Sequence, residues 1–174
     1  MLDKLSTITG IKPSFYQIDM TDEAKVEEIF VNHKIDGVIH FAGLKAVGES
    51  VSKPLEYYYN NLVSTIVLSG LCVKYGVGKF VFSSSATVYG NQPSPLKEDM
   101  ELKKTTNSYG ETKVMSERIL TDTANAGFAV SLLRYFNPVG AHESGLIGED
   151  PNGIPNNLMP FVTKVAKGQL EKLT

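Results

Sequence analysis

The fold of this chain is indicated most clearly by residues 54–83, PLEYYYNNLVSTIVLSGLCVKYGVGKFVFS. Apolar residues recur at helical spacing through 54–75, which predicts a long helix. Gly76 follows at once, and glycine commonly ends a helix. Residues 79–83 then form a short, mostly apolar run that is typical of a strand. A helix followed directly by a strand is the repeating unit of an α/β fold.

The same alternation extends in both directions. Further strands are predicted at 14–18, 37–41 and 129–135, and the 37–41 strand reads as buried on both faces. Further helices are predicted to begin at Thr21 or Asp22, at Ser108, and at Asn157 or Leu158, the last running to Lys167. This order predicts a Rossmann-like, mostly parallel, doubly wound sheet with helices on both faces.

Several polar or small residues follow the predicted strand ends, where ligands bind in sheets of this kind. They are Asp19, Gly43, Ser85 and Asn137. Two connections, 91–107 and 137–156, are long and irregular, and loops of that length are commonly binding loops or disordered.

Composition excludes several classes of function. The 174 residues are 42% apolar and 21% charged, as expected of one globular domain. A formal charge of −2 offers no basic field for nucleic acid or an anionic membrane. No segment is long and apolar enough to span a bilayer, and the first residues are polar, so we expect a cytoplasmic protein. Cys72 is the only cysteine, and the three histidines lack partners at ligand spacing, so no disulfide or metal site is expected.

Tyr109 and Lys113 are the most informative pair of chemical groups. A spacing of four residues places both side chains on one face of a helix. An ammonium beside a phenol favours the phenolate, and a hydroxyl from the serine run 83–85 could complete a proton relay. A free phenol titrates near pH 10, so lowering its pKa by about three units would need roughly 4 kcal/mol. Such a relay suits removal of a proton from a sugar or alcohol hydroxyl.

Six motifs together resemble the UDP-sugar 4-epimerases of the extended short-chain dehydrogenase/reductase family. They are 41–50 (FAGLKAVGES), 57–61 (YYYNN), 82–90 (FSSSATVYG), 109–113 (YGETK), 134–141 (RYFNPVGA) and 154–158 (IPNNL). The resemblance runs in order from about Ser14 to the C-terminus and departs most over 91–106. It implies that Ser85, Tyr109 and Lys113 are catalytic and that the cofactor is NAD.

The resemblance also implies sites for the two ligands. The residues matching cofactor contacts are Asp19, Phe41, Ala42, Gly43, Lys45, Asn60, Tyr109, Lys113 and Phe136. Those matching contacts to the UDP-sugar substrate are Ser85, Tyr109, Asn137, Asn157 and Leu158. The implied reaction interconverts UDP-glucose and UDP-galactose by transient oxidation at C4 of the sugar, a step of galactose metabolism.

Each of these residues has a simpler explanation. Asp19 could belong to the cap of the next helix, and Lys45 could be only a solvated charge. The asparagines could serve the turns beside Pro138 and Pro155.

The glycine-rich turn that opens the cofactor domain of this family is absent from the sequence. Without it, a pyrophosphate loses its backbone donors and helix N-terminus. We therefore expect 1–174 to be an internal fragment, a partial NAD-binding domain that reaches the substrate-binding region from about residue 137. We expect it to be inactive by itself. The resemblance also implies a homodimer formed through helices 54–75 and 108–125.

Three alternatives remain open. A nucleotide-sugar dehydratase of the same family would carry Asp-Glu after the threonine of the serine motif, where Val88 follows Thr87 in this chain. Epimerases acting on N-acetylated UDP-sugars or UDP-pentoses are harder to separate from sequence. A non-catalytic, dimerising remnant is the third, and retention of a nicotinamide absorbance through gel filtration would argue against it.

Overall fold

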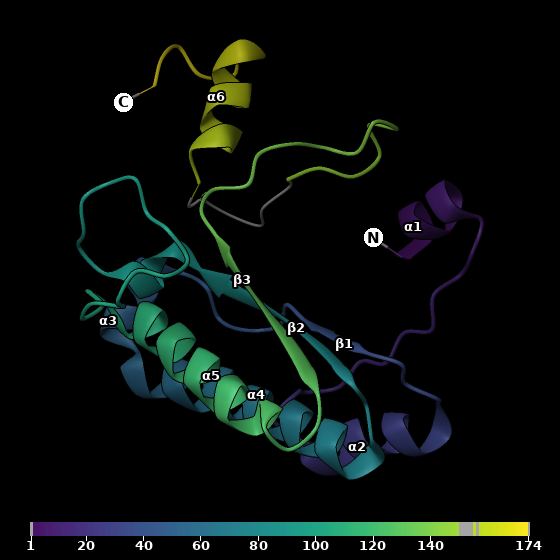
Figure 1. The fold of residues 1–174 in the computed structure, drawn as a ribbon. Helices are drawn as coiled ribbons and strands as arrows, with labels where there is room; N and C mark the ends of the chain where they lie inside the picture. The colour runs from purple at the N-terminus through teal and green to yellow at the C-terminus, as the bar shows by residue number, and fades with distance from the viewer. Residues whose placement is uncertain (1, 150–154, 156, 174) are drawn as a thin grey trace. The chain divides into compact units, whose positions relative to one another are not determined.

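The computed structural model describes residues 2–149, 155 and 157–173, and its ribbon is drawn in Figure 1. The chain divides into two compact units. One is Ile18–Phe136, and the other combines Met1–Gln17 with Asn137–Thr174.

The unit Ile18–Phe136 is built on a three-stranded parallel sheet. Its strands are β1 (Val38–His40), β2 (Lys79–Ser85) and β3 (Ala129–Tyr135), in the order β1-β2-β3. His40 lies opposite Phe82 in the register, and Ser85 lies opposite Tyr135. The predicted parallel, Rossmann-like fold class is thereby confirmed, and the bounds predicted for β3 are those observed.

Helices cover one face of this sheet, as Figure 1 shows. They are α2 (Glu23–Asn32), α3 (Val47–Ser52), α4 (Pro54–Tyr75) and α5 (Ser108–Ala124), with a short 3-10 helix η1 (Ala86–Tyr89) after β2. Phe80 and Phe82 of β2 point toward the helices and are 1% and 2% exposed. They pack with Leu71 of α4 and Leu120 of α5 in the main hydrophobic core, and burial of this apolar surface is the principal stabilising contribution.

The other face of the sheet differs from the prediction. Ile39 of β1 is 65% exposed, so this strand is buried on one face, not on both. Among the described residues of Ile18–Phe136, no helix covers that second face. The apolar run 37–41 suits a two-sided burial that this unit does not provide.

The strand predicted at 14–18 is also not formed, because residues 11–19 have no regular secondary structure. Phe15 is 63% exposed. A strand needs a neighbour to accept and donate its backbone hydrogen bonds, and the described strands supply none to this segment. The β-forming composition alone could not reveal the missing partner.

Helix ends follow the expected capping chemistry with one correction. Asp22 caps α2 by accepting a hydrogen bond from the Lys25 amide, as predicted. Helix α4 begins at Pro54 and ends at Gly76, whose φ of 66° is left-handed. Helix α5 is capped by Asn107, which accepts from the Gly110 amide at 2.8 Å, and not by Ser108.

The second unit contains two helices, α1 (Leu2–Thr9) and α6 (Leu158–Ala166). Helix α6 confirms the prediction to within one residue at its end. Residues 137–149 are irregular, as expected. The rest of the predicted 137–156 loop, apart from Pro155, lies outside the described residues.

Candidate active site

Helix α5 and the end of β2 bring the predicted catalytic groups together. Ser85 ends the strand, and Tyr109 and Lys113 lie on the first two turns of the helix. The Lys113 ammonium donates a hydrogen bond to the carbonyl oxygen of Ser83 at 2.6 Å. Its Nζ lies 4.7 Å from the ring centroid of Phe82 and 5.7 Å from that of Tyr109, so two aromatic rings flank the cation.

Burial dominates the proton affinities of this pair. Burial raises the pKa of the Tyr109 phenol above its usual value, and a hydrogen bond with Ser85 opposes the rise. Burial also lowers the pKa of the Lys113 ammonium to about 8. Lys113 is therefore not the cause of a lowered phenol pKa in this chain, in contrast to the expectation from their spacing. One of its three N–H groups donates to the Ser83 carbonyl oxygen.

The Ser85 hydroxyl is arranged to donate. Its Oγ accepts hydrogen bonds from the backbone amide of Thr87 at 3.2 Å and from the Thr87 hydroxyl at 3.0 Å. With these contacts on the oxygen, the hydroxyl proton remains available to a partner in the site. The buried serine is thus suited to share a proton with a substrate hydroxyl or with Tyr109.

The predicted cofactor loop follows β1 and is held by two side chains of α4. Asn61 accepts from the Leu44 amide at 2.8 Å and donates to the Leu44 carbonyl at 3.0 Å. The Tyr57 hydroxyl pairs with both backbone groups of Ala46, at 3.1 and 2.9 Å. Lys45, between the two held residues, is exposed and forms no ion pair with any residue that the structure describes.

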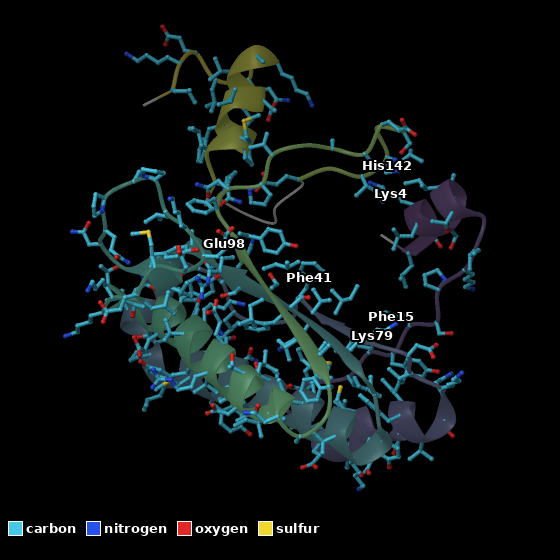
Figure 2. The ribbon with its side chains drawn as sticks, in the orientation of Figure 1. Lys4, Phe15, Phe41, Lys79, Glu98 and His142 are labelled. Carbon is cyan, nitrogen blue, oxygen red and sulfur yellow. The ribbon has the colours of Figure 1, made fainter. Side chains whose placement is uncertain are left out.

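Gly43 begins this loop in a conformation that suits glycine. Its φ is 155°, and a Cβ at this position would lie 3.1 Å from Oδ1 of Asn61. The neighbouring Phe41 is 64% exposed, and Figure 2 labels it together with Lys79 at the other end of the sheet. A glycine-containing backbone with an exposed aromatic ring and a free ammonium fits close approach of an anionic dinucleotide.

Two neighbouring asparagines that look equivalent in the sequence differ in burial and hydrogen bonding in the structure. Asn60, the predicted cofactor contact, is half-buried and its amide has no hydrogen-bond partner in the described part of the chain. Asn61 is 5% exposed, and its amide also donates to Thr112 of α5 at 3.1 Å. Sequence reasoning missed Asn61, although it lies one helical turn from Tyr57 and from Thr65 in the buried row of α4.

Asp19 and Phe136 are exposed and make local contacts. The Asp19 carboxylate accepts from the amide and the hydroxyl of Thr21, at 2.9 and 2.8 Å, which lowers its pKa. It therefore shapes the turn before α2 but does not cap that helix. Phe136 is 62% exposed, with its ring centroid 6.5 Å from that of Tyr89.

The three remaining predicted substrate residues belong to the second unit. Asn157 precedes α6 without capping it and donates to the Glu149 carboxylate at 2.7 Å. Leu158, the first residue of α6, is 67% exposed, and Asn137 is exposed as well.

Two negative findings concern only the described residues. No group of three or more His, Cys, Asp or Glu side chains is placed to hold a metal ion. None of the helices there has the length and hydropathy needed to cross a membrane.

Comparisons with known proteins identify the family to which the chain belongs. Residues 2–174 match the NAD dependent epimerase/dehydratase family. The chain is 57% identical to the UDP-glucose 4-epimerases of Haemophilus influenzae and Bacillus subtilis, with 99% of this chain and 52% of each relative covered. The crystal structure of UDP-glucose 4-epimerase from Bifidobacterium longum in complex with NAD+ and UDP matches with a TM-score of 0.91 and 55% identity, over 98% of this chain and 52% of that one. The chain thus spans about half the length of the curated relatives it matches.

Proposed function

Because the chain belongs to the NAD dependent epimerase/dehydratase family, we propose that it carries the proton-transfer centre of a UDP-glucose 4-epimerase. The reaction would interconvert UDP-glucose and UDP-galactose through a 4-keto sugar. The observation that carries the proposal is the meeting of Ser85, Tyr109 and Lys113 at one end of β2.

The residues present fit NAD at the end where the chemistry takes place. Lys45 would face the phosphates, and the backbone of 41–43 would pass close to the dinucleotide. Lys113 and Asn60 would hold the nicotinamide ribose region, Phe136 would pack beside it, and Asp19 would accept from the adenine amino group. When bound, NAD takes a hydride from C4 of the sugar and returns it to the opposite face.

The chain's own residues would move the proton. Tyr109, as phenolate, would take the proton of the 4-hydroxyl and later give it back. Because burial raises the pKa of this phenol in the chain itself, the positive charge that favours the phenolate would have to come from the nicotinamide of bound NAD. Ser85 would donate a hydrogen bond to the same sugar oxygen and keep its proton, because its Oγ already accepts from Thr87. Asn137, Asn157 and Leu158 would hold the UDP part of the substrate. Burial of Tyr109 and Lys113 shields the ketone from water.

We also propose that the chain forms a homodimer. Four large apolar residues of α4 share one face and are exposed: Leu55 (81%), Tyr59 (63%), Ile66 (51%) and Val73 (43%). Met115 of α5 is 40% exposed as well. A row of this kind on two packed helices suits association with a second copy. In sedimentation velocity, Ile66→Glu should shift the chain toward monomer, whereas Val31→Glu on α2 should not. Equal behaviour of both variants would argue against the α4 interface.

We also propose a cytoplasmic location for the protein.

The function is tested by exchanging segments. This chain would replace the matching half of the Haemophilus influenzae relative, and the chimera would be assayed for conversion of UDP-galactose into UDP-glucose. We expect activity, and Tyr109→Phe should lower kcat by roughly 10²–10⁴-fold. The control is Tyr75→Phe, which removes a hydroxyl that bonds Glu27 far along α4, and it should leave kcat unchanged.

Other products identify the alternatives. A 4-keto-6-deoxy sugar would indicate a dehydratase, and preference for UDP-N-acetylglucosamine would indicate an epimerase of different breadth. A folded, NAD-loaded chimera with no activity, or a Tyr109→Phe chimera with full activity, would refute the proposed role.

A further inference from the structure

Side chains from successive turns of helix α5 form hydrogen bonds with the serine run 83–85 of β2. Glu117 lies one turn beyond Lys113, and Lys113 lies one turn beyond Tyr109, so the three side chains share the face that meets the sheet. Lys113 holds the carbonyl of Ser83, and the Glu117 carboxylate accepts from the hydroxyl of Ser84 at 2.5 Å. The proposed reaction uses the first two of these turns and leaves Glu117 without a role.

Glu117 is only 4% exposed, so its charge must be compensated inside the protein. Arg134 of β3 supplies the compensation with a forked contact. Its Nη2 lies 2.8 Å from Oε2, and its Nε lies 3.0 and 3.3 Å from the two carboxylate oxygens. A planar guanidinium held in this way fixes direction as well as distance, so α5 is tied to β3 in one orientation.

The third nitrogen of Arg134 extends the network to the loop beyond β2. Nη1 donates to the Tyr89 hydroxyl at 3.3 Å and to the Glu98 carbonyl at 3.1 Å. The guanidinium carbon also lies 5.0 Å from the Tyr89 ring centroid. Figure 2 labels Glu98, which comes from the 91–107 loop. One side chain thus joins α5, η1, this loop and the end of β3, the strand that leads directly to Phe136.

We infer that Ser84, Glu117 and Arg134 are positioning residues that hold Ser85 at its working distance from Tyr109. The inference rests on the proposed function. Ser84 and Ser85 are consecutive residues at the end of β2, so holding the Ser84 side chain on α5 fixes the backbone from which Ser85 reaches Tyr109. A displacement of about 1 Å in such a site can lower a rate about 10²-fold.

If the ion pair between Glu117 and Arg134 only stabilised the fold, its variants would behave differently from those of a positioning pair. Arg134→Lys keeps the charge but loses the fork, and Ser84→Ala keeps both charges but loses the hold on the strand. If the pair only stabilised the fold, these variants would lower the melting temperature and leave the phenol of Tyr109 unaffected. If it positions Ser85, the Tyr109 titration must change, because Ser85 is the group that opposes the rise of its pKa.

The experiment titrates Tyr109 in the 174-residue chain by ultraviolet difference spectroscopy, with Tyr109→Phe subtracted. Ser85→Ala should raise the Tyr109 pKa, and Ser84→Ala should raise it in the same direction, by roughly half a unit. Arg134→Lys should give a smaller rise. Leu71→Ala, in the core and 1% exposed, is the control, and it should lower the melting temperature without moving the titration.

The outcomes separate this inference from the proposed function. If Ser85→Ala raises the Tyr109 pKa while Ser84→Ala and Arg134→Lys do not, the positioning role is refuted and the proposed function stands. If Ser85→Ala itself has no effect, the contact on which the proposed function depends is refuted. Should Glu117→Gln or Arg134→Lys fail to fold, Ser84→Ala, which loses a single hydroxyl, decides the question. In the active chimera, Ser84→Ala should lower kcat about 10-fold or more with KM unchanged.

Discussion

Two regions of the unit Ile18–Phe136 carry the proposed chemistry, and they are built differently. The catalytic seam, which comprises residues 83–85 and α5, is buried, and its polar groups bond one another. The cofactor edge, which comprises Asp19 and residues 39–45, presents exposed side chains such as Ile39 and Phe41. The groups proposed for proton transfer therefore contact one another within this unit, whereas many of the side chains proposed to contact the cofactor are exposed in the part of the chain that the structure describes.

This difference shows which groups of the proposed site are held in place by their neighbours. In the seam, each buried charge or hydroxyl has a partner from another element, so misplacing one group leaves others unsatisfied. At the edge, only the loop 43–46 is held, by Asn61 and Tyr57. Substitutions should therefore have large effects in the seam and small effects at the edge.

The largest difference in stability is expected between alanine substitutions at two phenylalanines. Phe82 is 2% exposed beneath the Lys113 ammonium, whereas Phe41 is 64% exposed. Phe82→Ala should lower the free energy of unfolding by about 3–5 kcal/mol because it leaves a cavity. Phe41→Ala should change it by about 0.5 kcal/mol or less. Urea unfolding of both variants measures these two changes in the free energy of unfolding. Similar losses of stability would contradict the difference between the seam and the edge.

A pH effect of about 3 kcal/mol should follow from His40, which packs beneath the seam. Burial, with a further contribution from the Lys113 charge, lowers the pKa of this imidazole from 6.5 to about 4. The unfolded chain therefore binds the proton first, and stability that is present above pH 6.5 is lost as the pH falls toward about 4. His40→Gln should flatten this slope by about one proton, as read from urea midpoints across the range. An unchanged slope would show that His40 is not buried as a neutral group.

Lys113 should have a smaller effect on stability than His40. Burial lowers its pKa from 10.5 to about 8, so the charged form destabilises the fold below that pH and the cost is relieved as the pH rises from about 8 to 10.5. Lys113→Met should raise the free energy of unfolding at neutral pH by about 1–2 kcal/mol, after allowance for its lost contacts. The exposed Lys45→Met at the cofactor edge should be neutral. Thermal unfolding of the pair is the test, and destabilisation by Lys113→Met would show that its contacts outweigh its burial.

The smallest of these comparisons lies at the edge itself. Gly43→Ala must place a Cβ at a φ of 155° and 3.1 Å from the Asn61 amide. We expect a loss of about 1 kcal/mol, at the low end of the cost of a strained backbone position. Gly48→Ala, where nothing lies within 4 Å of the new Cβ, is the matched control by calorimetry. Equal losses would mean that the loop is not held as described.

The sequence predicted those parts of the molecule whose signals are local. The bounds of α4 follow from Pro54 and Gly76, and the closeness of Ser85, Tyr109 and Lys113 follows from the four-residue spacing next to a serine-rich strand. The strand at 14–18 was wrong because its composition suits a sheet in which the described residues supply no partner.

The choice between Asn60 and Asn61 illustrates a second limit. The two residues are adjacent and chemically identical, and only the packing of α4 against the loop and α5 distinguishes them. The network of Ser84, Glu117 and Arg134 was missed for the same reason, because its members lie far apart in the chain. The Tyr109 pKa is raised in the chain without ligands, because burial of the phenol is the largest influence on it and the four-residue spacing does not show how deeply the side chain is buried.

The most direct test of a preformed seam is hydrogen–deuterium exchange on the 174-residue chain without ligands. Amides of β2 and α5, including those of 110–117, should exchange slowly and together, while those of 39–43 exchange much faster. Fast exchange throughout α5, at the rate of the cofactor edge, would contradict the account.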